Sequence, residues 1–435
     1  MTDSTSPGDG VVLPTPAQLI LCAAEPVGPV ADYRYAILSA LQGDTGVLED
    51  ALDQIARAPT GGGAGVAMRD NLVRSFQGGG YLAGADDLSV LTREFYAEPS
   101  DDPVTVLSDA LHTVMIVLVT RKLTQDQSFV AWIDRCADAI RDRQPNACLL
   151  ILDLDSAMPD FFQLAPRAAW SQALPADALG EHSVRPTIAA LAVLYRCLQV
   201  LTAGSDETQA TLRLFVSHAK LDGQPLAKAL ADMIQTLPGF DSFYDAADIA
   251  WGTDWSEVLK QGVRDSIVVV LRSDMYETRP WCTREMLWAD EFASPMVVVD
   301  LRSEAIALPS TISFDRAPSL RIPDGNLFRV IFMALREGVR ARLHVRTVRH
   351  LCDTGRLNPD NVHTIVRQPT MHALRSVCQR FAAQQTKKDL TILYPDPPMH
   401  RGDREAAEAL VASYAPGFRI MTPEELVATA GRLIA

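Results

Sequence analysis

A glutamate and a tryptophan that follow a buried strand are the residues of this sequence best placed to do chemistry. Ile267 to Leu271 is an apolar, β-branched run, which predicts a strand buried on both faces of a parallel sheet. After a polar turn with Pro280, a helix is predicted with Trp281 and Glu285 four residues apart on one face. Open α/β sheets bind ligands just past the carboxyl ends of such strands, so we expect a ligand site here. The alternative is that Glu285 is solvated and that Trp281 only packs.

The sequence before this run alternates between strands and helices. Leu212 to Ala219 predicts a short strand that enters a polar turn, and Pro225 to Thr236 predicts an amphipathic helix. Phe240 to Asp245 predicts a second short strand, and Trp255 to Arg264 a further helix. This alternation predicts a parallel sheet with helices on both faces.

Three sequence boxes in this region resemble the TIR (Toll/interleukin-1 receptor) domain family. The first is LFVSHAKLDG, which begins at Leu214, and the second is FYDAADIAWG, which begins at Phe243. The third combines Ser273-x-x-Tyr276 with Trp281-Cys282-x-x-Glu285. The resemblance runs from about residue 212 to about residue 344 and implies a flavodoxin-like parallel sheet.

TIR domains fall into two functional classes, and the resemblance carries both over to this chain as expectations. Some are adaptors that associate through the loop after the second strand. Others, common in bacteria and plants, cleave NAD+ at the nicotinamide–ribose bond, and some of these release a cyclised ADP-ribose. The cleaving class is marked by a glutamate on the helix after the third strand. That residue is Glu285 here, so the resemblance implies that Glu285 is catalytic.

A carboxylate suits this reaction. Breaking an N-glycosidic bond passes through an oxocarbenium-like state, which a carboxylate can stabilise or position by binding the ribose hydroxyls. Nicotinamide already leaves well, so no strong general acid is required. NAD+ is then the substrate, and no further cofactor and no metal are expected.

Other residues are expected to contact the substrate by the same resemblance. The predicted substrate-binding residues are Ser217, His218, Phe243, Tyr244, Trp251, Gly252, Ser273, Tyr276 and Trp281. His218 is also a candidate base, and strand alternation lets only one of Phe243 and Tyr244 face the cleft. Arg264 and Arg272 are candidates for the pyrophosphate or surface residues. Ala250-Trp251-Gly252 stands where the family usually has Pro-Gly, which weakens the expectation of assembly through this loop.

The first half of the chain repeats the order of these elements. The matched segments are Ile116–Arg121 with Ile267–Arg272, Leu149–Ser156 with Met296–Ser303, and the apolar helices Thr187–Leu201 with Leu327–Leu343. A shared order of several elements predicts a second, diverged TIR-like unit. The first of these matches has an offset of 151 residues, which, carried forward without gaps, puts Asp134 at the position of Glu285 and Val130 at that of Trp281. A carboxylate one methylene shorter retreats by about 1 Å, which can cost about a hundredfold in rate, so we expect Asp134 to be a solvated helix residue.

The predicted fold class is α/β, with two flavodoxin-like TIR units in tandem and a small C-terminal α/β piece. The predicted domain plan is a disordered tail at 1–15, the diverged unit at 16–203, a linker at 204–210, the TIR domain at 211–350 and the C-terminal piece at 351–435. A basic stretch from Arg336 to Arg349 is predicted to be one side of a solvated helix, or else a contact for an acidic neighbour.

Charge and cysteine usage limit the partners and the compartment. The net charge of −14 argues against a generic binder of nucleic acid or anionic membranes. The seven cysteines are scattered without metal-ligand spacing, which favours a reducing cytoplasm. The N-terminus lacks the basic segment of a signal peptide, and no apolar run approaches the length of a membrane span.

The leading hypothesis is a cytoplasmic, bacterial-type TIR NAD+ glycohydrolase that acts as an anti-phage immune effector. We expect a homo-oligomer through the TIR units, with catalysis that depends on assembly triggered by an activating protein or a nucleotide signal. The alternatives are a non-enzymatic TIR adaptor, with Glu285 solvated and Trp281 in the core, and a receptor for a nucleotide signal.

Overall fold

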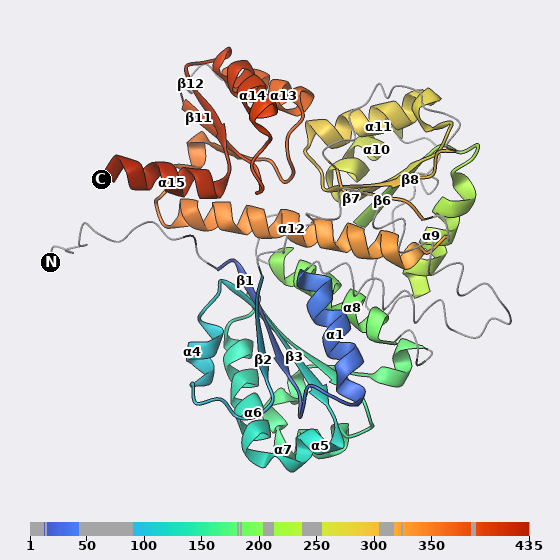
Figure 1. The fold of residues 1–435 in the computed structure, drawn as a ribbon, viewed down its shortest axis with the longest axis vertical. Helices are drawn as coiled ribbons and strands as arrows, with labels where there is room; N and C mark the ends of the chain where they lie inside the picture. Colours follow the sequence, from blue (N-terminus) through green and yellow to red (C-terminus); the bar gives the residue numbers. More distant parts are fainter. Residues whose placement is uncertain are drawn as a thin grey trace. The chain divides into compact units, whose positions relative to one another are not determined.

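The structure, a computed structural model, describes residues 13, 15–42, 90–180, 182, 185–202, 213–236, 255–303, 317–322, 325–383 and 389–434. These residues form three separate parallel sheets with accompanying helices (Figure 1). The predicted α/β class is therefore confirmed. Most of the predicted tail and the predicted linker 204–210 lie outside the described residues.

The first sheet has the flavodoxin-like strand order β2-β1-β3-β4-β5, and all its neighbouring strands are parallel. Its strands are β1 (Ala17–Cys22), β2 (Val90–Phe95), β3 (His112–Val119), β4 (Ala147–Asp153) and β5 (Ala173–Pro175). Its helices are α1 (Pro29–Gln42), α4 (Pro103–Leu107), α5 (Arg121–Gln125), α6 (Gln127–Asp142), α7 (Met158–Leu164) and α8 (Arg185–Thr202). Every residue of the central strand β3 is buried, as its apolar sequence predicts.

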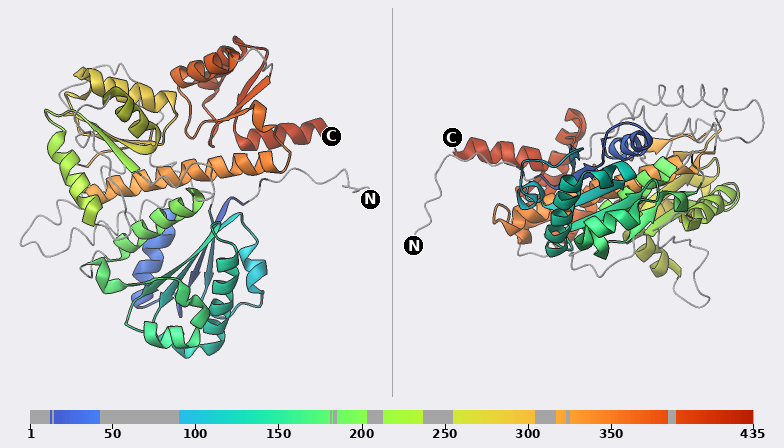
Figure 2. Two further views of the ribbon diagram at one scale, coloured as in Figure 1. Left: turned by 180° about the vertical axis from the view of Figure 1, so that it is seen from behind. Right: turned by 90° about the horizontal axis from the view of Figure 1, so that it is seen from below.

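The two faces of this sheet bury different helices. Successive side chains of a strand point to opposite faces, so Leu19 and Leu21 of β1 enter a core with α1 and α8. Ile20 and Cys22 enter a second core with α6. Figure 2 shows α1 and α8 on one side of the strands and α6 on the other. Coverage of both faces explains why these strands are continuous apolar runs.

The second sheet has the order β6-β7-β8-β9, again parallel. Its strands are β6 (Arg213–His218), β7 (Ser266–Arg272), β8 (Met296–Asp300) and β9 (Ser319–Leu320), and its helices are α9 (Gln224–Thr236), α10 (Trp255–Arg264), α11 (Pro280–Glu291) and α12 (Leu327–Asp353). This order matches β1, β3, β4 and β5 of the first sheet. The predicted strand Phe240–Asp245 lies outside the described residues.

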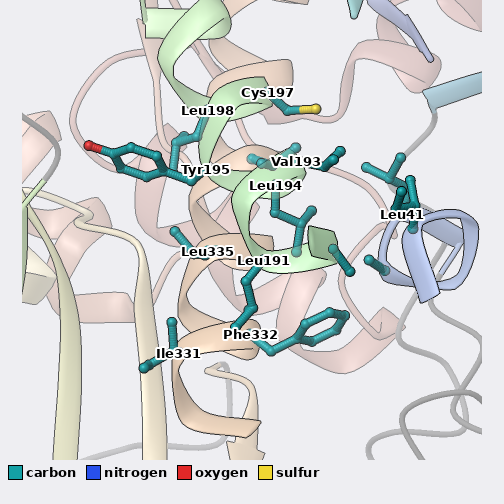
Figure 3. Close-up of a cluster of buried hydrophobic side chains, with 14 of the residues drawn as sticks. Leu41, Leu191, Val193, Leu194, Tyr195, Cys197, Leu198, Ile331, Phe332 and Leu335 are labelled. Carbon is teal, nitrogen blue, oxygen red and sulfur yellow. The ribbon is translucent and has the colours of Figure 1, made fainter. Parts of the chain in front are cut away.

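Helices α8 and α12 bring the two sheets into one hydrophobic core. Leu191 and Leu198 of α8 and Leu335 of α12 belong to this core (Figure 3). Gly338 marks a close approach: a Cβ there would lie 2.5 Å from Ile267 Cδ1 and 2.9 Å from Leu198 Cδ2. Any larger residue where α12 packs on both α8 and β7 would force the ends of these two side chains to shift.

The basic stretch of α12 is not one side of a solvated helix, so that prediction was wrong. Arg336 and His344 are buried, and burial lowers the pKa of His344 to about 4. The basic residues alternate along the helix with core residues such as Val339 and Leu343. Because the helix buries these apolar residues, it also buries some of the basic residues between them. Arg340 lies near Glu337, with 3.9 Å between Nε and Oε2.

The described residues form two compact units. The first consists of those in Thr15–Ala289 and Ser294–Leu343, and the second of those in Asp290–Ala293 and His344–Ala435. The third sheet belongs to the second unit. Its order is β10-β11-β12, all parallel. Its elements are β10 (Val362–Thr364), α13 (Met371–Ala382), β11 (Asp389–Leu393), α14 (Arg401–Ala412), β12 (Gly417–Met421) and α15 (Pro423–Ile434). This alternation of strands and helices agrees with the predicted small C-terminal α/β piece.

Candidate active site

The carboxyl ends of β6 and β7 bring several predicted site residues to one edge of the second sheet. The strands pair in parallel, with Ser217 opposite Val270 and His218 opposite Leu271. A short 3₁₀ turn follows β7, and Pro280 begins α11 at the position that helices favour for proline. Since the chain reverses between β7 and α11, the first turns of α11 return beside the same edge.

Two side-chain contacts fix the turn between β7 and α11. Asp222 accepts hydrogen bonds from Ser273 Oγ at 2.7 Å and from the backbone nitrogen of Met275 at 3.0 Å. Arg272 is buried and donates through Nε to Glu277 at 2.8 Å. The structure thus joins Ser273 to Asp222, and Arg272 to Glu277. Arg264 precedes β7 and lies at the opposite edge of the sheet.

Ser217, Tyr276 and Glu285 form a connected buried group at this edge. Ser217 Oγ donates to Glu285 Oε2 at 2.5 Å and lies 2.6 Å from Tyr276 Oη. The exposed fraction is 1% for Ser217, 0% for Tyr276 and 7% for Glu285. Glu285 is therefore not a solvated helix residue.

Glu285 lies on the buried face of helix α11, whose buried residues recur at helical spacing. Cys282, Glu285, Met286 and Ala289 form the buried stripe. Trp281 is 40% exposed, with the Arg284 guanidinium 5.1 Å from its ring centroid. The prediction that Trp281 and Glu285 share one face is thus only partly right, because Trp281 lies at the exposed border of that face.

Burial controls the protonation of Glu285. Desolvation raises its pKa from 4.5 to about 7, and the hydrogen bond from Ser217 acts in the opposite direction. Burial likewise raises the pKa of Tyr276, and it raises that of the Cys282 thiol to about 12, so both neighbours are neutral near pH 7.

Replacing Glu285 by glutamine is expected to stabilise the protein at alkaline pH. The pKa of Glu285 is about 7 in the folded protein, above the ordinary 4.5. The folded state therefore favours the neutral carboxyl, and this contribution to the free energy of unfolding is complete below pH 4.5 and is lost as the pH rises through 7. A shift of this size predicts a gain of about 3 kcal/mol for Glu285→Gln at about pH 8. Denaturant unfolding of both proteins across pH measures it; equal stability at about pH 8 would contradict the raised pKa.

His218 does not join the group around Glu285. Its Nδ1 lies 3.1 Å from the carbonyl oxygen of Val216, and its own carbonyl oxygen accepts a bond from Cys282 Sγ at 3.5 Å. Its ring is therefore oriented along its own strand, and no hydrogen bond with Glu285 is formed among the described residues.

The geometry agrees with a comparison to known families. Residues 214–316 match the family model of the TIR domain. The central part of this chain is a TIR domain. No curated protein and no solved structure matches the chain at a significant level. The match covers β6 from Leu214 onward together with α9, α10, β7, α11 and β8, and so includes every residue of the buried group.

Four predicted substrate-binding residues of the TIR domain lie outside the described residues. They are Phe243, Tyr244, Trp251 and Gly252. Their expected contacts with the substrate remain predictions.

In the part of the chain that the structure describes, no three His, Cys, Asp or Glu side chains gather as a metal site, and no helix is long and apolar enough to cross a bilayer.

The position in the first sheet that corresponds to Glu285 of the TIR domain has a structural role. Asp134 accepts a hydrogen bond from the backbone nitrogen of Arg167 at 2.7 Å and lies 3.6 Å from its Nε. The prediction that Asp134 is solvated was therefore wrong, since this contact ties α6 to the 3₁₀ segment Pro166–Trp170. Val130, at the position of Trp281, is buried.

Proposed function

We propose that this protein cleaves NAD+ at the nicotinamide–ribose bond, with Glu285 as the catalytic carboxylate. The observation that carries the proposal is the burial of Glu285 at the carboxyl ends of two parallel strands of a TIR domain, with one oxygen bound by Ser217. Burying a charge costs free energy, and groups with such perturbed pKa values gather at functional sites.

The arrangement is the reverse of what the adaptor alternative expects. That alternative places Glu285 in solvent and Trp281 in the core. Instead Glu285 is buried and Trp281 is 40% exposed. A structural carboxylate gains nothing from this position, whereas a reacting one gains a low-dielectric setting in which its charge acts strongly.

In the proposed reaction, Glu285 acts on the ribose. Oε2 is held by Ser217, and among the described residues no hydrogen bond engages Oε1. Oε1 would bind a ribose hydroxyl while the carboxylate charge stabilises the oxocarbenium-like state, as nicotinamide departs and water attacks. NAD+ is the substrate, and the proposal needs no other cofactor.

We also propose that the protein is a cytoplasmic bacterial immune effector whose activity depends on homo-oligomeric assembly. The TIR family includes enzymes of this kind, which supports the proposal at the level of the family. All seven cysteines are free thiols, which a reducing compartment maintains.

The test is NAD+ turnover by the purified full chain over a wide range of protein concentrations, with and without a crowding agent. Chromatography of nicotinamide, ADP-ribose and cyclic ADP-ribose identifies the products. We expect nicotinamide release, with a specific activity that rises with protein concentration. Absence of turnover in assembled protein, and in cells under phage challenge, would overturn the proposal in favour of an adaptor.

The pH dependence of turnover should follow the ionisation of Glu285. Its pKa of about 7 means that lowering the pH converts the needed carboxylate to its neutral form. The value of kcat/KM should fall about tenfold per pH unit below pH 7 and level off above it. Initial rates in buffers of constant ionic strength measure this profile; a rate that is flat down to about pH 5 would contradict it.

A further inference from the structure

The hydroxyl groups of Tyr276 and Ser217 form a chain of hydrogen bonds that ends at Glu285 and in which each group donates toward the carboxylate. We call this chain the relay. Ser217 has a single hydroxyl proton, which it donates to Glu285 Oε2 at 2.5 Å. Toward Tyr276 Oη, 2.6 Å away, Ser217 Oγ must then be the acceptor, and Tyr276 the donor. The proton order is therefore Tyr276 to Ser217 to Glu285.

The relay is enclosed and spans separate segments. Tyr276 comes from the turn after β7, Ser217 from the end of β6 and Glu285 from α11. All three side chains are buried. Hydrogen bonds in such surroundings are stronger than in water and fix the orientation of their members. The turn that carries Tyr276 is itself held, since Asp222 binds the backbone nitrogen of Met275.

From this geometry we propose that Ser217 and Tyr276 are positioning residues, which hold Oε2 of Glu285 and leave Oε1 to the ribose. The inference rests on the proposed function for its catalytic consequence, but the relay itself can be tested without turnover. It replaces the sequence-based expectation that Ser217 and Tyr276 contact the substrate, because the Ser217 hydroxyl already serves two partners.

The relay also selects the charge state of Glu285. Ionised Glu285 accepts the Ser217 bond more strongly than protonated Glu285 would, because hydrogen bonds to a charged acceptor are roughly twice as strong as those to a neutral one. The neighbouring titratable groups are Cys282, on the same helix, with Asp222 and Arg279 near its thiol, Glu277 near Tyr276, and His218 on β6. Among the described residues, Ser217 is the hydrogen-bond donor to the carboxylate, so its removal should have a specific effect.

The test uses Ser217→Ala, Tyr276→Phe and the hydroxyl-retaining Ser217→Thr in the full chain. The first measurement is the pKa of Glu285 by ¹³C NMR of its side-chain carboxyl, with Glu285→Gln to assign the signal. Ser217→Ala should raise this pKa by about one unit, Tyr276→Phe should raise it by less, and Ser217→Thr should restore most of the parent value. Circular dichroism confirms that each variant is folded.

The second measurement is the steady-state kinetics of NAD+ cleavage. Ser217→Ala should lower kcat by about 10- to 100-fold and change KM by less than about threefold, because a misplaced carboxylate loses rate but not substrate binding. An unchanged pKa of Glu285 in both folded variants overturns the relay. A rise in KM with unchanged kcat also overturns it, in favour of direct substrate contact. If the parent lacks turnover but its pKa responds as expected, the relay stands and the proposed function fails.

Discussion

Glu285→Gln is expected to lower kcat for NAD+ cleavage by about a thousandfold or more. Glutamine keeps the size of the side chain, and its carbonyl oxygen can still accept the bond from Ser217, so the buried group should stay in place. What disappears is the negative charge at the edge of the sheet. Charge stabilisation in an enclosed site is often the largest contribution to catalysis. Nicotinamide release by parent and variant at equal concentration and assembly state measures the effect.

Glu291→Gln is the matched control for this variant. It makes the same chemical change on the same helix, at the end of α11 remote from the site, and should retain turnover within about twofold. If Glu285→Gln retained turnover comparable to that of the control, Glu285 would not be the catalytic carboxylate. The turnover would then have to be assigned to other residues.

Gly338→Leu should destabilise the first compact unit by about 2 to 3 kcal/mol, near the upper end of typical overpacking costs. The first atom of any side chain at this position already lies 2.5 Å from Ile267 Cδ1, and a leucine adds three more carbons. Neither α8 nor β7 can withdraw without opening the common core. Urea unfolding followed by circular dichroism measures the loss.

Two controls separate overpacking from the general effect of replacing glycine in a helix. A Cβ at Gly402 in α14 would meet no atom within 4 Å, so Gly402→Leu should be neutral or slightly stabilising. Gly338→Ala should lie between the two, because better helix propensity, worth about 1 kcal/mol, offsets part of its clash with the ends of two flexible side chains. Equal stability of Gly338→Leu and Gly402→Leu would contradict the close approach.

The elements around the site could be predicted because local signals agreed there. The apolar run that became β7 could only be a buried strand, and Pro280 marked the start of α11. Strand β2 gave no such signal and was missed. It is an edge strand that carries Arg93 and Glu94, and the polarity of Glu94 is explained by Arg34, which donates to it from α1.

The burial of Glu285 could not be predicted from the sequence. Spacing along α11 placed Glu285 near Trp281, but which of them faced the sheet depended on Ser217, 68 residues earlier in the chain. The same limit explains Asp134, whose partner Arg167 follows it by 33 residues, and Arg336, whose burial follows from the packing of α12. In these cases, contacts with residues far away in the sequence decide whether a polar side chain is buried, and the residues next to it in the sequence do not.

The core built on α8 and α12 has a consequence for the inheritance of this TIR domain. Transfer of the domain alone into another gene by recombination would leave Ile331, Leu335 and Gly338 without their cover from α8. An exposed apolar stripe of that kind promotes aggregation. We therefore expect the TIR domain to be inherited together with the first α/β unit, which would preserve that unit in evolution even if it bound no ligand of its own.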